Sequence, residues 1–132
     1  MFKNNKALPE EQWSYSVIEA IFDHVKSETG NQSVQYNMFG HSAGAQFVHR
    51  FVTFKQNTHL NKAIAANSGW YTVPDTRIEY PYGLKNSGFS DLSTLTHLFG
   101  SNLIVALGDQ DTDPNDSSLR HTPEADAQGS SP

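Results

Sequence analysis

Hydrophobic positions along the chain alternate between helical and strand-like spacing. Segments with apolar residues three and four positions apart predict helices; these are 11–29, 43–55 and 91–99, with a weak fourth helix from Pro123. Apolar runs too short for helices predict the strands 33–39, 62–67 and 102–107. Strands that alternate with helices are typical of a parallel sheet. We therefore expect an α/β fold with about three parallel strands and helices on both faces.

The ends of the first helix and of the chain carry weaker signals. Ser16 and Glu19 have the spacing of a capping box, and Gly30 follows the last helical residue as a C-terminal cap. Residues 1–10 and 127–132 show no pattern, and we expect them to be disordered. The whole chain, 1–132, is expected to form a single, incomplete domain.

A long segment without periodic pattern, 68–90, separates the second strand from the third helix. Loops of this length are usually functional or disordered, but Trp70, Tyr71, Tyr80 and Tyr82 are uncommon in disordered segments. We interpret the loop as ordered and close to the functional site. The alternative, that its aromatic side chains only cover the core, is equally compatible with the sequence.

The first predicted strand runs into Gly40-His41-Ser42-Ala43-Gly44, and a predicted helix follows. This is the G-x-S-x-G pattern of a nucleophile elbow, in which a strained turn exposes a serine hydroxyl. Gly40 and Gly44 are expected to avoid collisions with neighbouring backbone, and the Ala43 N–H is expected to point toward a developing oxyanion. The bare motif arises by chance, but its position between strand and helix favours the catalytic interpretation over an ordinary βα turn.

Composition and charge exclude several functional classes. The 132 residues include no cysteine, so neither disulfides nor thiolate chemistry is available. Lys and Arg balance Asp and Glu over residues 1–108, and the net charge of −5 comes entirely from 109–132. A neutral body with an acidic tail argues against nucleic acid as a partner. No apolar run could span a membrane and no signal peptide is recognisable, so the compartment is taken as cytoplasmic by default.

The third predicted strand ends at a glycine followed by a cluster of acids. Asp109, Asp111, Asp113 and Asp116 resemble a calcium loop in spacing, but Pro114 and Arg120 occupy the positions that need glycine and glutamate. We therefore expect no metal. As the acid of a catalytic triad, Asp111 is preferred and Asp113 remains an alternative.

Six histidines could serve as a catalytic base. His41 lies inside the elbow and is expected to point away from the reacting centre, while a packing or surface role is expected for His49 and for its neighbour Arg50. His24, His59 and His97 precede the third strand, which is out of the expected order. His121 is the one histidine after the acid, and it remains an alternative as the base.

Several segments together resemble the α/β-hydrolase superfamily and, within it, polyhydroxybutyrate-depolymerase-like esterases. They are the elbow through Phe51, 66–75, 80–84 and 108–128. The resemblance implies a serine hydrolase in which Ser42 forms an acyl-enzyme, Ala43 supplies an oxyanion N–H and Asp111 orients a histidine. It also implies a small-molecule or polymeric ester as substrate and no cofactor.

The same resemblance implies that parts of the family pattern are absent. The family's histidine follows a further strand, and its second oxyanion donor comes from an early loop; neither is recognisable in this chain. The sequence therefore looks like an internal part of a hydrolase. The alternative function is that of an inactive fragment, or of a subunit that needs a partner chain and could self-associate through an unpaired sheet edge.

Overall fold

The computed structural model describes residues 2–3, 6–113, 115–117, 119 and 121–128. The strands are β1 (Phe2–Lys3), β2 (Lys6–Ala7), β3 (Tyr36–His41), β4 (Leu60–Ala66) and β5 (Leu103–Ala106). The helices are α1 (Ser14–Thr29), α2 (Ala43–Phe54), α3 (Leu92–Phe99) and α4 (Pro123–Asp126), and a 3-10 turn, Glu10–Gln12, precedes α1. The main strands β3 to β5 and the four α-helices therefore follow the predicted pattern, with bounds within three residues of those predicted, whereas β1 and β2 were not predicted.

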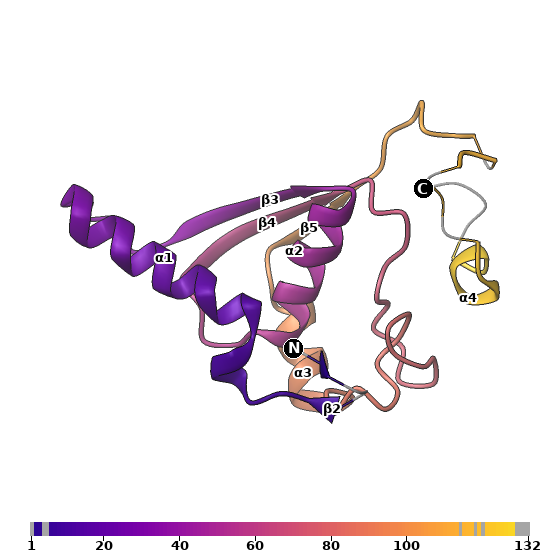
Figure 1. Ribbon diagram of the computed structural model, residues 1–132, viewed down its shortest axis with the longest axis horizontal. Helices are drawn as coiled ribbons and strands as arrows, with labels where there is room; N and C mark the ends of the chain where they lie inside the picture. The colour runs from indigo at the N-terminus through magenta and orange to yellow at the C-terminus, as the bar shows by residue number, and fades with distance from the viewer. Residues whose placement is uncertain (1, 4–5, 114, 118, 120, 129–132) are drawn as a thin grey trace.

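The main sheet contains three parallel strands in the order β3-β4-β5 (Figure 1). Because all strands run the same way, their carboxyl ends share one edge of the sheet. Phe39 lies beside Ile64, which in turn lies beside Ile104, so these three positions form one row across the sheet. The predicted parallel α/β arrangement is confirmed.

One face of this sheet packs against α2, which lies directly beneath β3 and β4 in Figure 1. Ala63 and Ala65 of β4 are completely buried, and their small side chains let the helix approach closely. The apolar side of α2 completes this core with Ala45, Val48, Phe51 and Val52. The alternation along β4 therefore places its smallest residues where the helix lies closest.

The opposite face of the sheet is not covered by any helix in the described part of the chain. Phe39 is 69% exposed and Ile104 is 45% exposed, although both are apolar strand residues. The expectation of helices on both faces is therefore wrong for the described residues, because the helices gather on one side. We call the row of Phe39, Ile64 and Ile104 the open face.

The start of α1 differs from its prediction. The helix begins after Trp13, which makes no side-chain cap, and the predicted capping box of Ser16 and Glu19 does not form. The Ser16 hydroxyl instead donates to the Glu10 carbonyl, at 2.7 Å. The C-terminal prediction is correct, because Gly30 has a φ of 67°, which a glycine adopts without strain.

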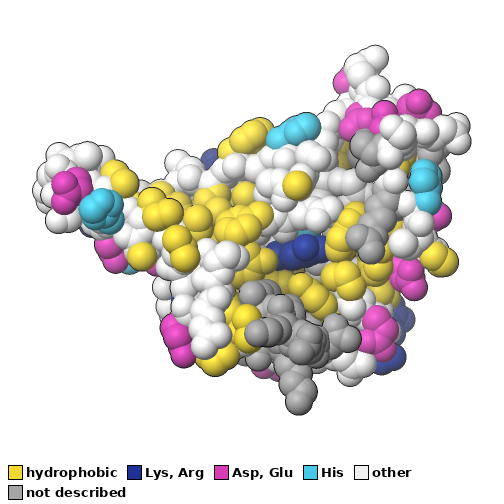
Figure 2. Space-filling view, viewed as in Figure 1, with side chains coloured by type: hydrophobic (Ala, Val, Ile, Leu, Met, Phe, Trp, Pro, Cys, Tyr) yellow, Lys and Arg dark blue, Asp and Glu magenta, His cyan; other side chains and the backbone are white. Residues whose placement is uncertain are grey.

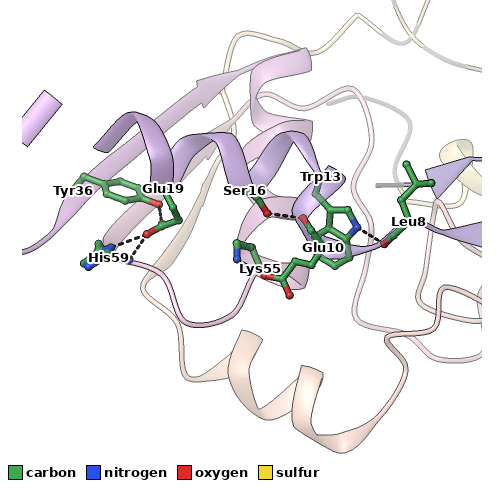
Figure 3. A network of polar contacts seen from close by, with 8 residues as sticks. All are labelled: Leu8, Glu10, Trp13, Ser16, Glu19, Tyr36, Lys55 and His59. Carbon is green, nitrogen blue, oxygen red and sulfur yellow. Dashed lines mark hydrogen bonds and ion pairs between the residues drawn. The ribbon is translucent and has the colours of Figure 1, made fainter. Parts of the chain in front are cut away.

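Glu19 has a tertiary role instead (Figure 3). Its carboxylate accepts a hydrogen bond from the Tyr36 hydroxyl, and it also contacts the His59 ring, with 2.7 Å between Oε2 and Nδ1. Burial alone would raise the pKa of Glu19, but the hydrogen bonds from Tyr36 and His59 outweigh burial and lower it. Glu19 thus connects α1 to the amino ends of β3 and β4.

The long loop after β4 is ordered and contains a second, smaller hydrophobic cluster. Trp70 and Tyr82 pack against Ala125 of α4, with 4.6 Å between the centres of the two rings. Gln128 accepts from the Tyr71 N–H and donates to the Tyr71 carbonyl, at 2.8 and 2.7 Å. We call Trp70, Tyr82 and Ala125 the satellite cluster; it joins the loop to the C-terminal segment.

Other aromatic residues of the same loop, Tyr71, Tyr80 and Phe89, pack against the main core. Covering the core, the alternative that the sequence left open, is therefore one role of this loop. Of the terminal segments expected to be disordered, Phe2–Lys3 pairs with Lys6–Ala7 and Gln128 contacts Tyr71, while residues 1, 4–5 and 129–132 lie outside the described residues.

Candidate active site

Ser42 lies at the turn between β3 and α2, in a backbone conformation that L-residues rarely adopt. Its φ is 54° and its ψ is −119°. Of the four described non-glycine residues with positive φ, three are asparagines, which tolerate this region better than serine does. Strain of this kind costs about 1–3 kcal/mol and is typical of functional sites. Ser42 therefore lies at a turn between a strand and a helix, as the sequence predicts, in a sparsely populated backbone conformation.

The two glycines of the motif differ in what a side chain would meet. A Cβ on Gly40 would lie 2.2 Å from the Gly44 carbonyl oxygen, so only glycine allows β3 to meet the start of α2. Beyond its chain neighbours and the backbone of its own helix, a Cβ on Gly44 would meet no described atom within 4 Å. The expectation that both glycines avoid a collision is therefore right for Gly40 and wrong for Gly44 within the described residues.

Some backbone N–H and carbonyl groups around Ser42 form hydrogen bonds within the sheet or within α2, and others have no acceptor there. The Ser42 N–H donates to the Ala66 carbonyl at 3.0 Å, which attaches the elbow to β4. The Ser42 carbonyl accepts from the Ala45 N–H, the first donor of the α2 turn. The N–H groups of Ala43 and Gly44 precede that donor and have no acceptor within the helix. They lie at the positive end of the α2 dipole, next to Ser42.

Asn67 links the elbow region to the acidic loop, and sequence reasoning gave it no role. It follows β4 directly, and its N–H donates to the Ala106 carbonyl at 2.9 Å. Its side-chain oxygen accepts from the Gly108 N–H at 2.8 Å, and its Nδ2 lies 3.5 Å from Asp111 Oδ2. Asparagine tolerates positive φ better than most residues do, and Asn67 has a φ of 47°.

The two candidate acids have different surroundings. The Asp111 carboxylate lies beside Asn67, which is adjacent in sequence to the acceptor of the Ser42 N–H. The Asp113 carboxylate instead accepts from the Asn115 N–H at 2.9 Å, within its own turn. Both side chains are exposed. Asp111 thus lies beside the residue that follows β4, while Asp113 stabilises a local turn.

The structure does not bring a histidine to Ser42 among the residues it describes, since no hydrogen bond joins the serine hydroxyl to an imidazole. The His121 Nδ1 lies 3.3 Å from the Asp126 carboxylate, on the exposed C-terminal segment. The His97 Nε2 lies 3.0 Å from the Val52 carbonyl, and His59 contacts Glu19. His41 is exposed, on the same side of β3 as Phe39.

His49 is a buried histidine with both ring nitrogens occupied. The Nδ1–H donates to the Ala45 carbonyl at 2.8 Å, and Nε2 accepts from the Thr72 N–H at 3.0 Å. Arg50 attaches to the same loop, because its Nε donates to the Thr72 hydroxyl and its guanidinium lies 4.4 Å from the centre of the Trp70 ring. Burial lowers the pKa of His49 to about 4, so the ring is neutral at neutral pH. Both residues therefore pack α2 against the loop.

Neither a metal centre nor a membrane span emerges from the described residues. Within them, no three His, Asp or Glu side chains are grouped closely enough to hold an ion, and the calcium-loop positions Pro114 and Arg120 lie outside the description. None of the described helices is long and apolar enough to cross a membrane.

Comparison with known proteins gives matches to solved structures, whereas no protein-family model and no curated protein matches the chain. Poly(aspartic acid) hydrolase-1 from Sphingomonas sp. KT-1 is 44% identical, with a TM-score of 0.93 over 98% of this chain and 49% of that one. The poly(3-hydroxybutyrate) depolymerase LpqC from Bordetella parapertussis is 29% identical, with a TM-score of 0.86 over 96% of this chain and 42% of that one.

The chain thus spans about half the length of these two relatives. Over that half, the likeness extends through the elbow, the long loop and the acidic segment. The structure of this chain is therefore that of a partial α/β-hydrolase fold, and its resemblance to a polyhydroxybutyrate depolymerase is confirmed.

Proposed function

We propose that this chain carries the nucleophile half of a serine hydrolase site that acts on carboxylic esters. The observation that carries the proposal is the strained backbone of Ser42 at the start of α2, beside N–H groups that the helix does not use. The two relatives support the reaction class, since one is named as a hydrolase and the other as a depolymerase, each of a polymer. A polymeric or small-molecule ester is the proposed substrate.

In the proposed reaction, the Ser42 oxygen adds to the carbonyl carbon of the ester while its proton passes to a base. The negative charge that develops on the carbonyl oxygen is stabilised by the Ala43 N–H and by the positive end of α2. Collapse of this intermediate expels the alcohol, which takes up the proton, and leaves an acyl-enzyme on Ser42. Water then adds to the acyl carbon and gives a proton to the base. The base passes this proton to the Ser42 oxygen as the acid is released.

Asp111 is the proposed acid that orients the base. Its carboxylate lies on a loop that Asn67 holds at the same sheet edge as Ser42, and this supports Asp111 over Asp113. The base itself is the missing component. His121 is the alternative within this chain, but its ring contacts Asp126, which argues for a local role.

A second function is favoured by the lack of a described histidine beside Ser42. In this alternative the chain by itself is inactive, and it works as a subunit that requires a partner to complete the site. Loss of one triad member typically removes several orders of magnitude in rate. We therefore expect the isolated chain to hydrolyse p-nitrophenyl esters barely faster than buffer.

Labelling with a fluorophosphonate tests the role of Ser42 without knowledge of the substrate. We expect slow formation of an adduct that mass spectrometry locates on Ser42, with no adduct in Ser42→Ala. An adduct on another residue would contradict the proposed nucleophile. Fast ester turnover that disappears in Ser42→Ala would contradict the second function, and His121→Ala would then test for a base within this chain.

A further inference from the structure

Asn67 lies between the strand that holds the elbow and the loop that carries Asp111. The Ala66 carbonyl accepts the Ser42 N–H at 3.0 Å, and the Asn67 N–H donates to the Ala106 carbonyl at 2.9 Å. These two groups belong to one peptide unit, which therefore contacts the chain at the carboxyl ends of both β3 and β5. The Asn67 side chain thus starts from a fixed point between the nucleophile and the acidic loop.

The side-chain amide of Asn67 closes a ring of contacts with this loop. Its Oδ1 accepts from the Gly108 N–H at 2.8 Å, and the Gly108 carbonyl accepts from the Asp111 N–H at 3.3 Å. The ring closes where Asn67 Nδ2 lies 3.5 Å from Asp111 Oδ2. Because the Gly108 N–H can only donate, it requires the amide oxygen on its side, and this directs the NH₂ group toward the carboxylate.

The backbone on both sides of this contact is adapted to it. Asn67 has a φ of 47°, a conformation that persists only where the surroundings fix it. A Cβ on Gly108 would lie 2.9 Å from Asn67 Nδ2, so a side chain at this position would displace the amide. The residue types at the two positions therefore allow a close approach that most other pairs of residues would prevent.

The Asp111 carboxylate has no cationic partner in the part of the chain that the structure describes, where none of the ion pairs includes it. Residues 106–119 contain four aspartates and neither Lys nor Arg. Figure 2 shows acidic side chains gathered over the segment that follows β5. Like charges repel one another, so a specific donor is needed to hold one of these carboxylates in place. The Asn67 amide supplies that donor and leaves the negative charge intact.

We propose that Asn67 is the positioning residue for the acid of this site, an inference that rests on the proposed function because that function assigns the acid to Asp111. The amide oxygen anchors the start of the loop at Gly108, and the amide NH₂ group donates to the Asp111 carboxylate. The carboxylate is thereby held, still charged, for a base to bind. Asn67 acts through Asp111 and is given no contact with the ester.

Substitutions at Asn67 separate the two ends of its amide. Asn67→Asp keeps an oxygen for the Gly108 N–H but places a carboxylate against Asp111, whereas Asn67→Ala removes both contacts. Hydrogen exchange at single backbone amides is measured by NMR on the isotope-labelled chain. We expect exchange at the Gly108 N–H to be about tenfold faster in Asn67→Ala and little changed in Asn67→Asp. Exchange at the Asp111 N–H should be faster in both variants, because the carboxylate is released.

A double substitution tests the contact itself. Asn67→Asp combined with Asp111→Asn restores one donor and one acceptor in reversed order, so exchange at the backbone N–H of position 111 should return to within about twofold of the unmodified chain. Asn67→Asp combined with Asp113→Asn is the matched control, because it has the same net charge. Asp113 contacts the Asn115 N–H and not Asn67, so this control should restore nothing.

Restoration by Asp111→Asn and not by Asp113→Asn supports the proposal. Unchanged exchange at the Asp111 N–H in Asn67→Asp overturns it, as does a failure of Asp111→Asn to restore the slow exchange. Equal restoration by both double variants also overturns it, because the charge of the segment would then matter rather than the contact. If circular dichroism shows that Asn67→Ala does not fold, Asn67→Asp and its two double variants decide the matter. Restoration by Asp111→Asn in a chain that forms no fluorophosphonate adduct on Ser42 upholds the contact and contradicts the proposed function.

Discussion

The two faces of the β3-β4-β5 sheet both carry apolar side chains, but along β3 and β4 these side chains differ in their exposure to solvent. On the covered face, Ala63 and Ala65 are completely buried against α2. On the open face, the larger Phe39 is 69% exposed and Ile104 is 45% exposed. Apolar strand residues alone therefore do not show that the described part of the chain covers a face of the sheet. The stability of the chain should depend on one face, and its interactions on the other.

The largest expected effect comes from the covered face. Phe51→Ala removes a completely buried ring from α2 and should lower the free energy of unfolding by about 3–5 kcal/mol, because a cavity remains. Phe39→Ala, a truncation of the same ring on the open face, should change it by less than about 0.5 kcal/mol. Urea denaturation of both variants provides the measurement. Equal losses would mean that the two faces are equally buried in solution.

The next effect depends on pH and on the contact between α2 and the long loop. The pKa of His49 is lowered from 6.5 to about 4 in the folded protein, so the unfolded chain takes up the proton first as the pH falls. The contribution of neutral His49 is fully present above about pH 6.5 and is lost toward pH 4, by roughly 3 kcal/mol. Denaturation at pH 7, 5.5 and 4 measures this loss. In His49→Gln the same decrease in pH should lower the free energy of unfolding by less. An unchanged pH dependence would mean that groups other than His49 cause the loss of stability.

A smaller effect is expected where β3 meets α2. Gly40→Ala brings a methyl group 2.2 Å from the Gly44 carbonyl and should cost about 1–3 kcal/mol, because backbone has to move. Gly44→Ala meets open space and replaces glycine in a helix, so it should be neutral or stabilising by up to about 1 kcal/mol. Thermal unfolding of this pair tests the distinction. A large loss in Gly44→Ala would show that an element of the protein covers the elbow from outside.

The smallest effect on stability belongs to the open face. Ile104→Thr keeps a β-branched side chain on β5 and should change the free energy of unfolding by less than about 1 kcal/mol. If the isolated chain self-associates through this face, the substitution should weaken that association, because the apolar row is interrupted. Sedimentation at several protein concentrations measures this change. A loss of stability comparable with that of Phe51→Ala would place Ile104 in the core.

Local patterns predicted the fold well because the relevant forces act within a few residues of one another. Gly40-His41-Ser42-Ala43-Gly44 specifies its own turn, and the strand and helix around it follow from apolar spacing. Glu19 shows the limit of such reasoning. Its spacing from Ser16 suggested a cap, but Tyr36 and His59, 17 and 40 residues further along the chain, provide its partners.

Asn67 was missed for the same reason. Its side chain accepts a hydrogen bond from the N–H of Gly108, 41 residues away, and no local sequence pattern predicts that contact. The exposure of the open face could not be predicted either, because a strand sequence shows whether a face is apolar but not whether another element of the chain packs against it.

The two tryptophans of the chain lie in separate hydrophobic regions, one in the main core and one in the satellite cluster. Trp13 belongs to the main core and donates to the Leu8 carbonyl, whereas Trp70 packs with Tyr82 and Ala125. Each indole is therefore an optical reporter of its own region, and Trp13→Phe and Trp70→Phe each leave one signal. Since small clusters commonly open at lower free energy than the core, the Trp70 emission should change before the Trp13 emission during denaturation. The chain thus carries its own internal test of whether it unfolds as one cooperative unit.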